Sequence, residues 1–158
     1  MASRRRIAVA DGQSAIVAWL TSLDSLDSQA TAITNTPNQP DRAVLATATR
    51  YGLEELAARQ PGNAVEVRVP PFGAVQAVRG PRHTRGTPPN VVEMSAPTWL
   101  ALITGRLTWT QALSDRLVSA SGSRAEELAT QLPLWQVTKA VADATPALQN
   151  AESPEQAV

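Results

Sequence analysis

The sequence predicts an α+β fold built around a small sheet, and three observations lead to this class. Residues 64–69 (AVEVRV) alternate strictly between apolar and charged side chains, which is the period of a strand with one solvated face. Residues 41–60 instead place their apolar side chains at helical spacing. From there the chain reads as a helix, three strands, two helices, a strand and a helix, which differs from the regular alternation of an α/β protein.

The first forty residues are expected to form a short helix followed by a polar linker. Residues 11–20 predict the helix, with Asp11 as its N-cap and Ile16, Trp19 and Leu20 on one face. Residues 21–40 consist mainly of Ser, Thr, Asn, Gln, Asp and Pro, a composition typical of a loose connection. We therefore place residues 1–40 outside a compact domain that spans residues 41–134.

The compact domain is predicted to begin with a helix over residues 41–60. Asp41 is the expected N-cap, Pro61-Gly62 ends the helix, and the apolar stripe consists of Leu45, Ala48, Gly52, Leu53 and Leu56. A glycine inside a helix costs about 1 kcal/mol relative to alanine. Close packing of another element against Gly52 would justify that cost.

Strands and short helices fill the rest of this domain. Strands are predicted over residues 64–69, 72–78, 91–94 and 117–122, and helices over residues 95–105, 108–114 and 123–132. The pairs Thr108–Gln111 and Ser123–Glu126 have the spacing of capping boxes. Residues 135–158 carry a weak helical stripe and then become polar, so an acidic, partly disordered tail is expected, and whether it is helical stays open.

The composition excludes several classes of site. The chain has no cysteine and one histidine, His83, which excludes disulfides, thiolate metal sites and any site with two imidazoles. Residues 3–6 (SRRR) resemble the start of an export signal, but only four apolar residues follow before Asp11, and a signal needs about 7–15. We expect a cytoplasmic protein without a transmembrane segment, because the apolar runs are far shorter than the ~18 residues of a membrane span.

The formal net charge of zero hides an asymmetry. Residues 41–125 carry a net charge of +4 and residues 126–158 a net charge of −4. The densest basic cluster is the predicted loop that holds Arg79, Arg82, His83 and Arg85. One hypothesis is a site for a phosphate or carboxylate, which arginine side chains bind well; the other is a solvated basic loop that neutralises acidic residues. A zero net charge argues against a globally basic nucleic-acid binder.

Three of the four tryptophans, Trp99, Trp109 and Trp135, lie in or beside the short C-terminal helices. Large apolar side chains facing a sheet rich in Ala, Val and Gly can leave a cavity, and an apolar cavity suits a lipophilic ligand. An ordinary filled core explains the same residues and stays open as the alternative.

The order of residues in the second half resembles a known family. The chain resembles the sterol carrier protein type-2 superfamily at these positions: Trp99-Leu100, Leu102, Gly105-Arg106-Leu107, Ala112, Leu117-Val118 and Gly122. Residues 70–93 look like its actinobacterial branch, the sterol carrier family proteins or bacterial sterol carrier protein orthologues, and 13 Arg against one Lys suits such a source. The resemblance covers residues 41–134. It implies about five mostly antiparallel strands covered on one face by helices, with an apolar tunnel between them for sterols, fatty acids or acyl-CoA.

These observations lead to one principal hypothesis and two alternatives. The principal one is a non-catalytic carrier of a lipophilic ligand such as a fatty acid, acyl-CoA or another lipid, with no cofactor and no metal. The apolar lining would consist of Phe72, Val75, Trp99, Ile103, Trp109, Leu113, Val118, Leu128 and Leu132. The anionic head group of the ligand would meet Arg79, Arg82, His83 and Arg85.

The alternatives are an accessory protein-interaction domain with a filled core, or an isomerase-type enzyme that uses His83. A related fold occurs in mycothiol-dependent maleylpyruvate isomerases, but their metal-binding domain needs several histidines and this chain has one. Transient contact with a membrane stays open, and the sequence indicates neither a protein partner nor an oligomeric state.

Overall fold

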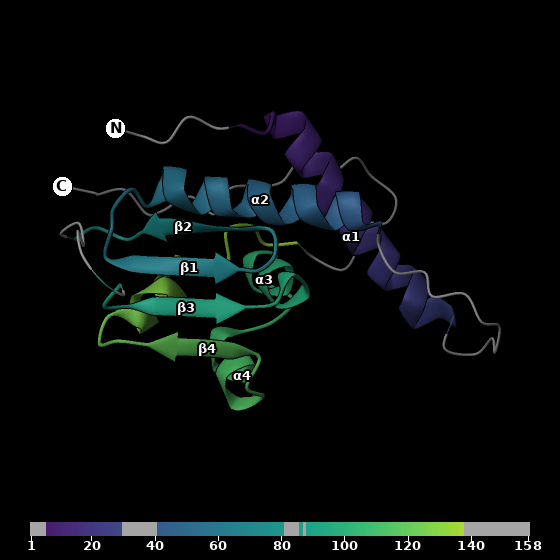
Figure 1. The fold of residues 1–158 in the computed structure, drawn as a ribbon. Helices are drawn as coiled ribbons and strands as arrows, with labels where there is room; N and C mark the ends of the chain where they lie inside the picture. Colours follow the sequence, from purple (N-terminus) through teal and green to yellow (C-terminus); the bar gives the residue numbers. More distant parts are fainter. Residues whose placement is uncertain (1–5, 30–40, 81–85, 87, 138–158) are drawn as a thin grey trace, which may run out of the picture.

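The computed structural model describes residues 6–29, 41–80, 86 and 88–137, and it confirms the α+β class (Figure 1). In chain order the elements are α1 (Val9–Gln29), α2 (Arg42–Arg59), β1 (Val65–Val69), β2 (Gly73–Ala77), β3 (Val91–Met94), α3 (Ala96–Ile103), α4 (Trp109–Ser114), β4 (Val118–Ser121) and a 3₁₀ helix, η1 (Ala125–Gln131). No helix among these residues has both the length and the apolar character needed to cross a membrane.

The sheet has the strand order β2-β1-β3-β4 and is mixed (Figure 1). β1 pairs antiparallel with β2 and parallel with β3, and β3 pairs antiparallel with β4. Two of the three strand pairs are antiparallel, so the expected mostly antiparallel sheet is confirmed, but the described residues form four strands where about five were expected. The parallel pair arises because the chain leaves β2 and returns on the other side of β1.

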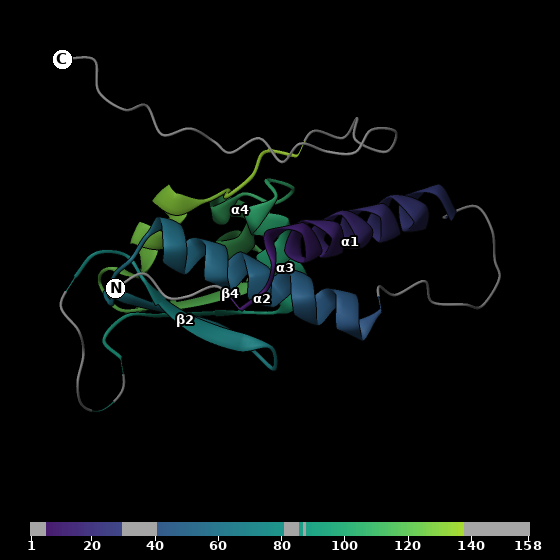
Figure 2. The ribbon, with the colours of Figure 1, turned by 90° about the horizontal axis from the view of Figure 1, so that it is seen from above.

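The helices lie on one side of the sheet, as the view from above shows (Figure 2). Alternation along β1 buries Val65, Val67 and Val69 against them, while Glu66 and Arg68 of the same strand stay partly exposed on the other face. The strand predicted with one solvated face is confirmed.

The first helix is longer than the sequence predicts. Ile16, Trp19 and Leu20 form its buried stripe, as expected, but the helix continues as far as Gln29. Hydroxyl groups in the polar segment bond within the helix; the Oγ of Ser22, for example, donates to the carbonyl oxygen of Trp19 at 2.6 Å. The expectation of a linker beginning at residue 21 is wrong for residues 21–29, because packing of the apolar stripe outweighs local composition.

Helix α2 agrees with its prediction in detail. The Asp41 side chain caps it by accepting from the backbone N–H of Ala43 at 3.0 Å. A Cβ placed on Gly52 would lie 2.6 Å from Cδ1 of Ile103 and 2.9 Å from Nε1 of Trp99. The close packing expected at Gly52 is confirmed, and the packed element is α3.

The two predicted capping boxes have different outcomes. In α4 the backbone N–H of Gln111 donates to Oγ1 of Thr108 at 3.2 Å, which confirms the N-cap. The second box is wrong: the segment is a 3₁₀ helix that begins after Arg124, without a side-chain cap. The backbone N–H of Arg124 donates instead to Oδ1 of the buried Asn90 at 3.0 Å, which ties the start of η1 to the start of β3. Residues 138–158 lie outside the described residues, and so does most of the predicted tail.

Candidate functional site

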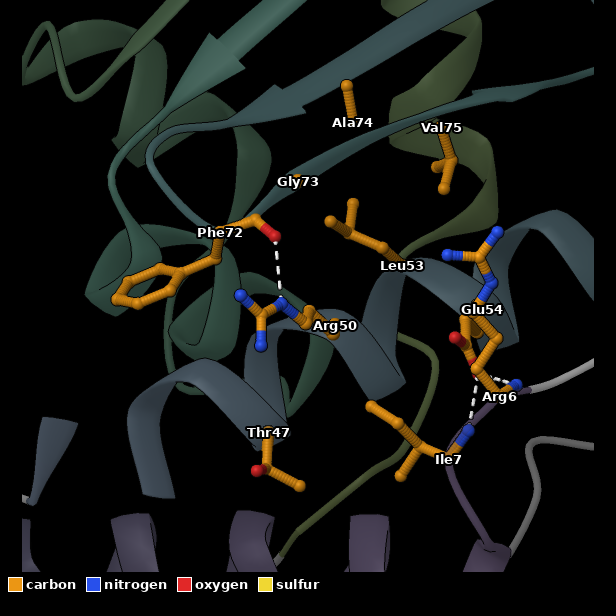
Figure 3. Close-up of a pocket in the computed structure, with 10 residues that line it drawn as sticks. All are labelled: Arg6, Ile7, Thr47, Arg50, Leu53, Glu54, Phe72, Gly73, Ala74 and Val75. Atoms are coloured by element: carbon orange, nitrogen blue, oxygen red, sulfur yellow. Dashed lines mark hydrogen bonds between the residues drawn. The ribbon is translucent and has the colours of Figure 1, made fainter. Parts of the chain in front are cut away.

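A groove of about 710 Å³ lies between α2 and the edge strand β2 (Figure 3). We call it the α2–β2 groove. It is lined by Arg6, Ile7, Thr47, Arg50, Leu53, Glu54, Phe72, Gly73, Ala74 and Val75. Its volume falls within the ~300–1,000 Å³ typical of small-molecule sites.

One face of α2 provides four of the lining residues. Thr47, Arg50 and Leu53 are spaced three residues apart, and Glu54 follows four residues after Arg50, so these side chains share that face of the helix. Nε of Arg50 donates to the carbonyl oxygen of Phe72 at 3.0 Å, which ties α2 to the turn before β2. The same bond fixes the plane of the guanidinium and leaves its two terminal NH₂ groups directed elsewhere.

Glu54 brings the segment before α1 into the site. Its Oε2 accepts the backbone N–H groups of both Arg6 and Ile7, at 2.9 and 3.1 Å. Bonds to an ionised acceptor are shorter and stronger than neutral ones, so these two hold the segment against α2. Residues more than forty positions away in the sequence therefore complete one side of the groove (Figure 3).

Apolar and polar side chains share the lining of the groove. The side chains of Ile7 and Leu53 point into the space, and Val75 faces it from β2 (Figure 3). The ring of Phe72 turns away from Leu53, so it adds little to the interior (Figure 3). Gly73 contributes no side chain, which keeps β2 open to the groove at that point.

The charges of the groove favour an anion. Arg6 and Arg50 stand on either side of Leu53 (Figure 3), and among the described residues of the lining Glu54 is the only acidic one. The Arg6 guanidinium has no hydrogen-bond or ionic partner within the described part of the chain. Arginine side chains in this state suit the oxygens of a carboxylate or phosphate.

The structure places the predicted lining residues in two regions. Phe72 and Val75 belong to the α2–β2 groove, and the other seven do not line it. Of those seven, Trp99, Ile103, Val118 and Leu128 are buried, and Trp109, Leu113 and Leu132 are partly buried against the core. Trp99 also donates from Nε1 to the carbonyl oxygen of Thr49 at 3.3 Å. Whether these seven residues contact a ligand stays a prediction.

The predicted head-group residues lie mostly beyond the described part of the chain. Arg79 is exposed, and its carbonyl oxygen accepts from Nη2 of Arg124 at 2.8 Å. Arg82, His83 and Arg85 lie outside the described residues.

Sequence reasoning missed most of the residues of the α2–β2 groove, namely Arg6, Ile7, Thr47, Arg50, Leu53, Glu54, Gly73 and Ala74. Arg50 and Glu54 look like ordinary solvated residues of a helix surface, and the one available signal was their shared helical face. Within the described ranges, no three His, Asp or Glu side chains gather as metal ligands would.

Comparison with known proteins gives one family. A family model described as "Bacterial SCP ortholog" matches residues 41–134, which include α2, the whole sheet and η1. No curated protein matches the chain. Arg6, Ile7 and all of α1 lie before the matched segment.

Proposed function

The chain belongs to the family of bacterial sterol carrier protein orthologues, and from this premise we propose that it is a non-catalytic carrier of a lipophilic ligand. The proposed ligands are fatty acids, acyl-CoA or other lipids. The observation that carries the proposal is the α2–β2 groove, in which the apolar side chains of Ile7, Leu53 and Val75 accompany two arginines. A cytoplasmic location is part of the same proposal.

The proposed interaction needs no chemistry beyond burial and charge. Each methylene group removed from water contributes about 0.8 kcal/mol, so a chain of roughly ten such groups supplies about 8 kcal/mol before the cost of association. The carboxylate of Glu54, which lines the groove, is already engaged by two backbone N–H groups. An assignment as a carrier therefore fits the side chains better than an assignment as an enzyme.

The decisive experiment is titration of the full chain with a fluorescent fatty acid, cis-parinaric acid. We expect saturable binding with one ligand per chain, and binding that fails to saturate at about tens of micromolar would contradict the proposal.

A variant locates the ligand. A Cβ on Gly73 would lie 3.4 Å from Cδ1 of Leu53, which is ordinary contact, so Gly73→Val fits the fold while its side chain takes up groove space. We expect Gly73→Val to weaken binding about tenfold, the equivalent of about two buried methylenes. Gln76→Val on the same strand is the matched control, because Gln76 does not line the groove. If Gly73→Val bound the fatty acid as tightly as the native chain, the result would instead assign the ligand to the predicted residues between sheet and helices, such as Leu113 and Leu132.

One observation favours the second candidate, an accessory domain with a filled core. Trp99, Ile103 and Leu128 are fully buried. The same titration separates the two functions, because a domain with a filled core and no ligand would give no saturable signal.

A further inference from the structure

The strand β2 ends the sheet, and no strand among the described residues lies beside its outer edge. The backbone N–H of Glu66 donates to the carbonyl oxygen of Asn90, next to β3, so the polar backbone groups of Glu66 and Arg68 face β3. By alternation, the other residues of β1 face β2, and their partners Gly73, Val75 and Ala77 face back toward β1. The N–H and C=O groups of Ala74 and Gln76 are therefore left on the free edge.

This edge lacks the features that usually prevent a further strand from pairing. Between Gly73 and Ala77 the strand has no charged residue and no proline. Gly73 and Ala74 are exposed, and both line the α2–β2 groove. The side of α2 that carries Thr47 and Arg50 lines the same groove, so the space beside β2 is bounded by α2 but holds no strand among the described residues.

Positive charges accompany the edge. Arg50 bonds to the carbonyl oxygen of Phe72, directly before β2 begins, and Arg6 lines the same groove as Val75, which lies in the middle of the strand (Figure 3). Arg79 follows two residues after β2 ends. The uncharged strand β2 thus has one arginine at its start, one along the groove and a third two residues after its end. This positive charge favours an acidic partner.

We propose that the free edge of β2 binds an extended acidic peptide segment of another protein as a fifth strand. Backbone bonds to Ala74 and Gln76 would hold the segment, as in other cases of strand addition, and its carboxylates would meet Arg6 and Arg50. A second copy of this chain is the weaker candidate, because antiparallel pairing of β2 with itself would bring the same arginines of both copies to one edge. This interaction goes beyond the proposed lipid binding, and its test needs no lipid.

The test is an NMR titration of the full ¹⁵N-labelled chain with three capped octapeptides. The first alternates Glu with Thr, the second alternates Lys with Thr, and the third alternates Glu with Pro. We expect only the Glu-Thr peptide to bind saturably and to slow amide hydrogen exchange at Ala74 and Gln76. Proline has no N–H to donate to the ladder, and lysine reverses the charge.

Protein variants complete the design. Arg50→Gln should weaken binding of the Glu-Thr peptide about tenfold, because it removes one charge-assisted contact. Arg42→Gln is the matched control; Arg42 is an exposed arginine of the same helix that does not line the groove, and its variant should bind normally. Equal binding of the Glu-Pro peptide, binding of the Lys-Thr peptide, or absence of protection at Ala74 and Gln76 would each overturn the proposal. Concentration-dependent protection without peptide would identify a second copy as the occupant and overturn it as well.

Discussion

Replacement of Gly52 by alanine sets two effects of known size against each other. Alanine is favoured over glycine inside a helix by about 1 kcal/mol, so helix propensity alone predicts a more stable protein. The new methyl group, however, would lie 2.6 Å from Cδ1 of Ile103 and 2.9 Å from Nε1 of Trp99. Both side chains are fully buried, and the indole is also hydrogen-bonded, so neither yields easily. Overpacking costs about 1–3 kcal/mol, and we expect Gly52→Ala to be destabilised by up to about 2 kcal/mol.

Urea unfolding of the full chain measures this effect, and the same helix provides a reference. Arg50 is exposed in the middle of α2, so the difference in unfolding free energy between Arg50→Ala and Arg50→Gly gives the propensity term without packing. Ile103→Val removes the atom closest to the new methyl group. The double variant Gly52→Ala/Ile103→Val should therefore be more stable than the sum of the single effects predicts, by about 0.5 kcal/mol or more.

Two results would refute this reasoning. If Gly52→Ala gained the full propensity difference seen at Arg50, α3 would not pack against Gly52 as the structure shows. If the effects of Gly52→Ala and Ile103→Val simply added, the clash would not involve Cδ1 of Ile103.

Two further predictions concern polar groups. Oγ1 of Thr49 is buried without a hydrogen-bond partner in the described part of the chain, so Thr49→Val should raise the unfolding free energy by about 1 kcal/mol in urea; a loss of stability would show that the hydroxyl is satisfied. The hydrogen bond from Arg124 lowers the pKa of Glu127, and this contribution to stability is present at neutral pH and lost as pH falls through the folded-state pKa. The difference in unfolding free energy between the native chain and Glu127→Gln should therefore become smaller as the pH is lowered. A difference that does not change with pH would contradict a role of the Arg124 hydrogen bond in stability.

The parts of the fold that could be predicted from the sequence are those with strong local signals. The alternation of residues 64–69 determines which face of β1 is buried, and Asp41 and Pro61-Gly62 mark the limits of α2. The full length of α1 was not predictable, because its last turns have the composition of a loop and the helix is supported by packing of its first half. The parallel direction of β3 depends on the side of β1 to which the chain returns, and no local pattern encodes that choice.

The candidate site was harder to predict, for a physical reason. The apolar residues Phe72 and Val75 could be chosen as lining because they belong to a recognisable strand. The charged residues of the α2–β2 groove acquire their role from contacts between residues distant in the sequence, such as the bond between Glu54 and the backbone of Arg6, 48 positions away. A carboxylate that holds a distant backbone looks the same in a sequence as one that faces water.

Family membership and the α2–β2 groove therefore depend on different parts of the chain. The matched segment, residues 41–134, provides the sheet, α2 and Arg50, but the second cation and one apolar wall come from Arg6 and Ile7. Glu54 is the link, because its carboxylate holds these two residues against the matched segment through two hydrogen bonds. Loss of that carboxylate would release one side of the groove without touching the sheet, so the proposed ligand binding would be weakened through residues that lie before the matched segment.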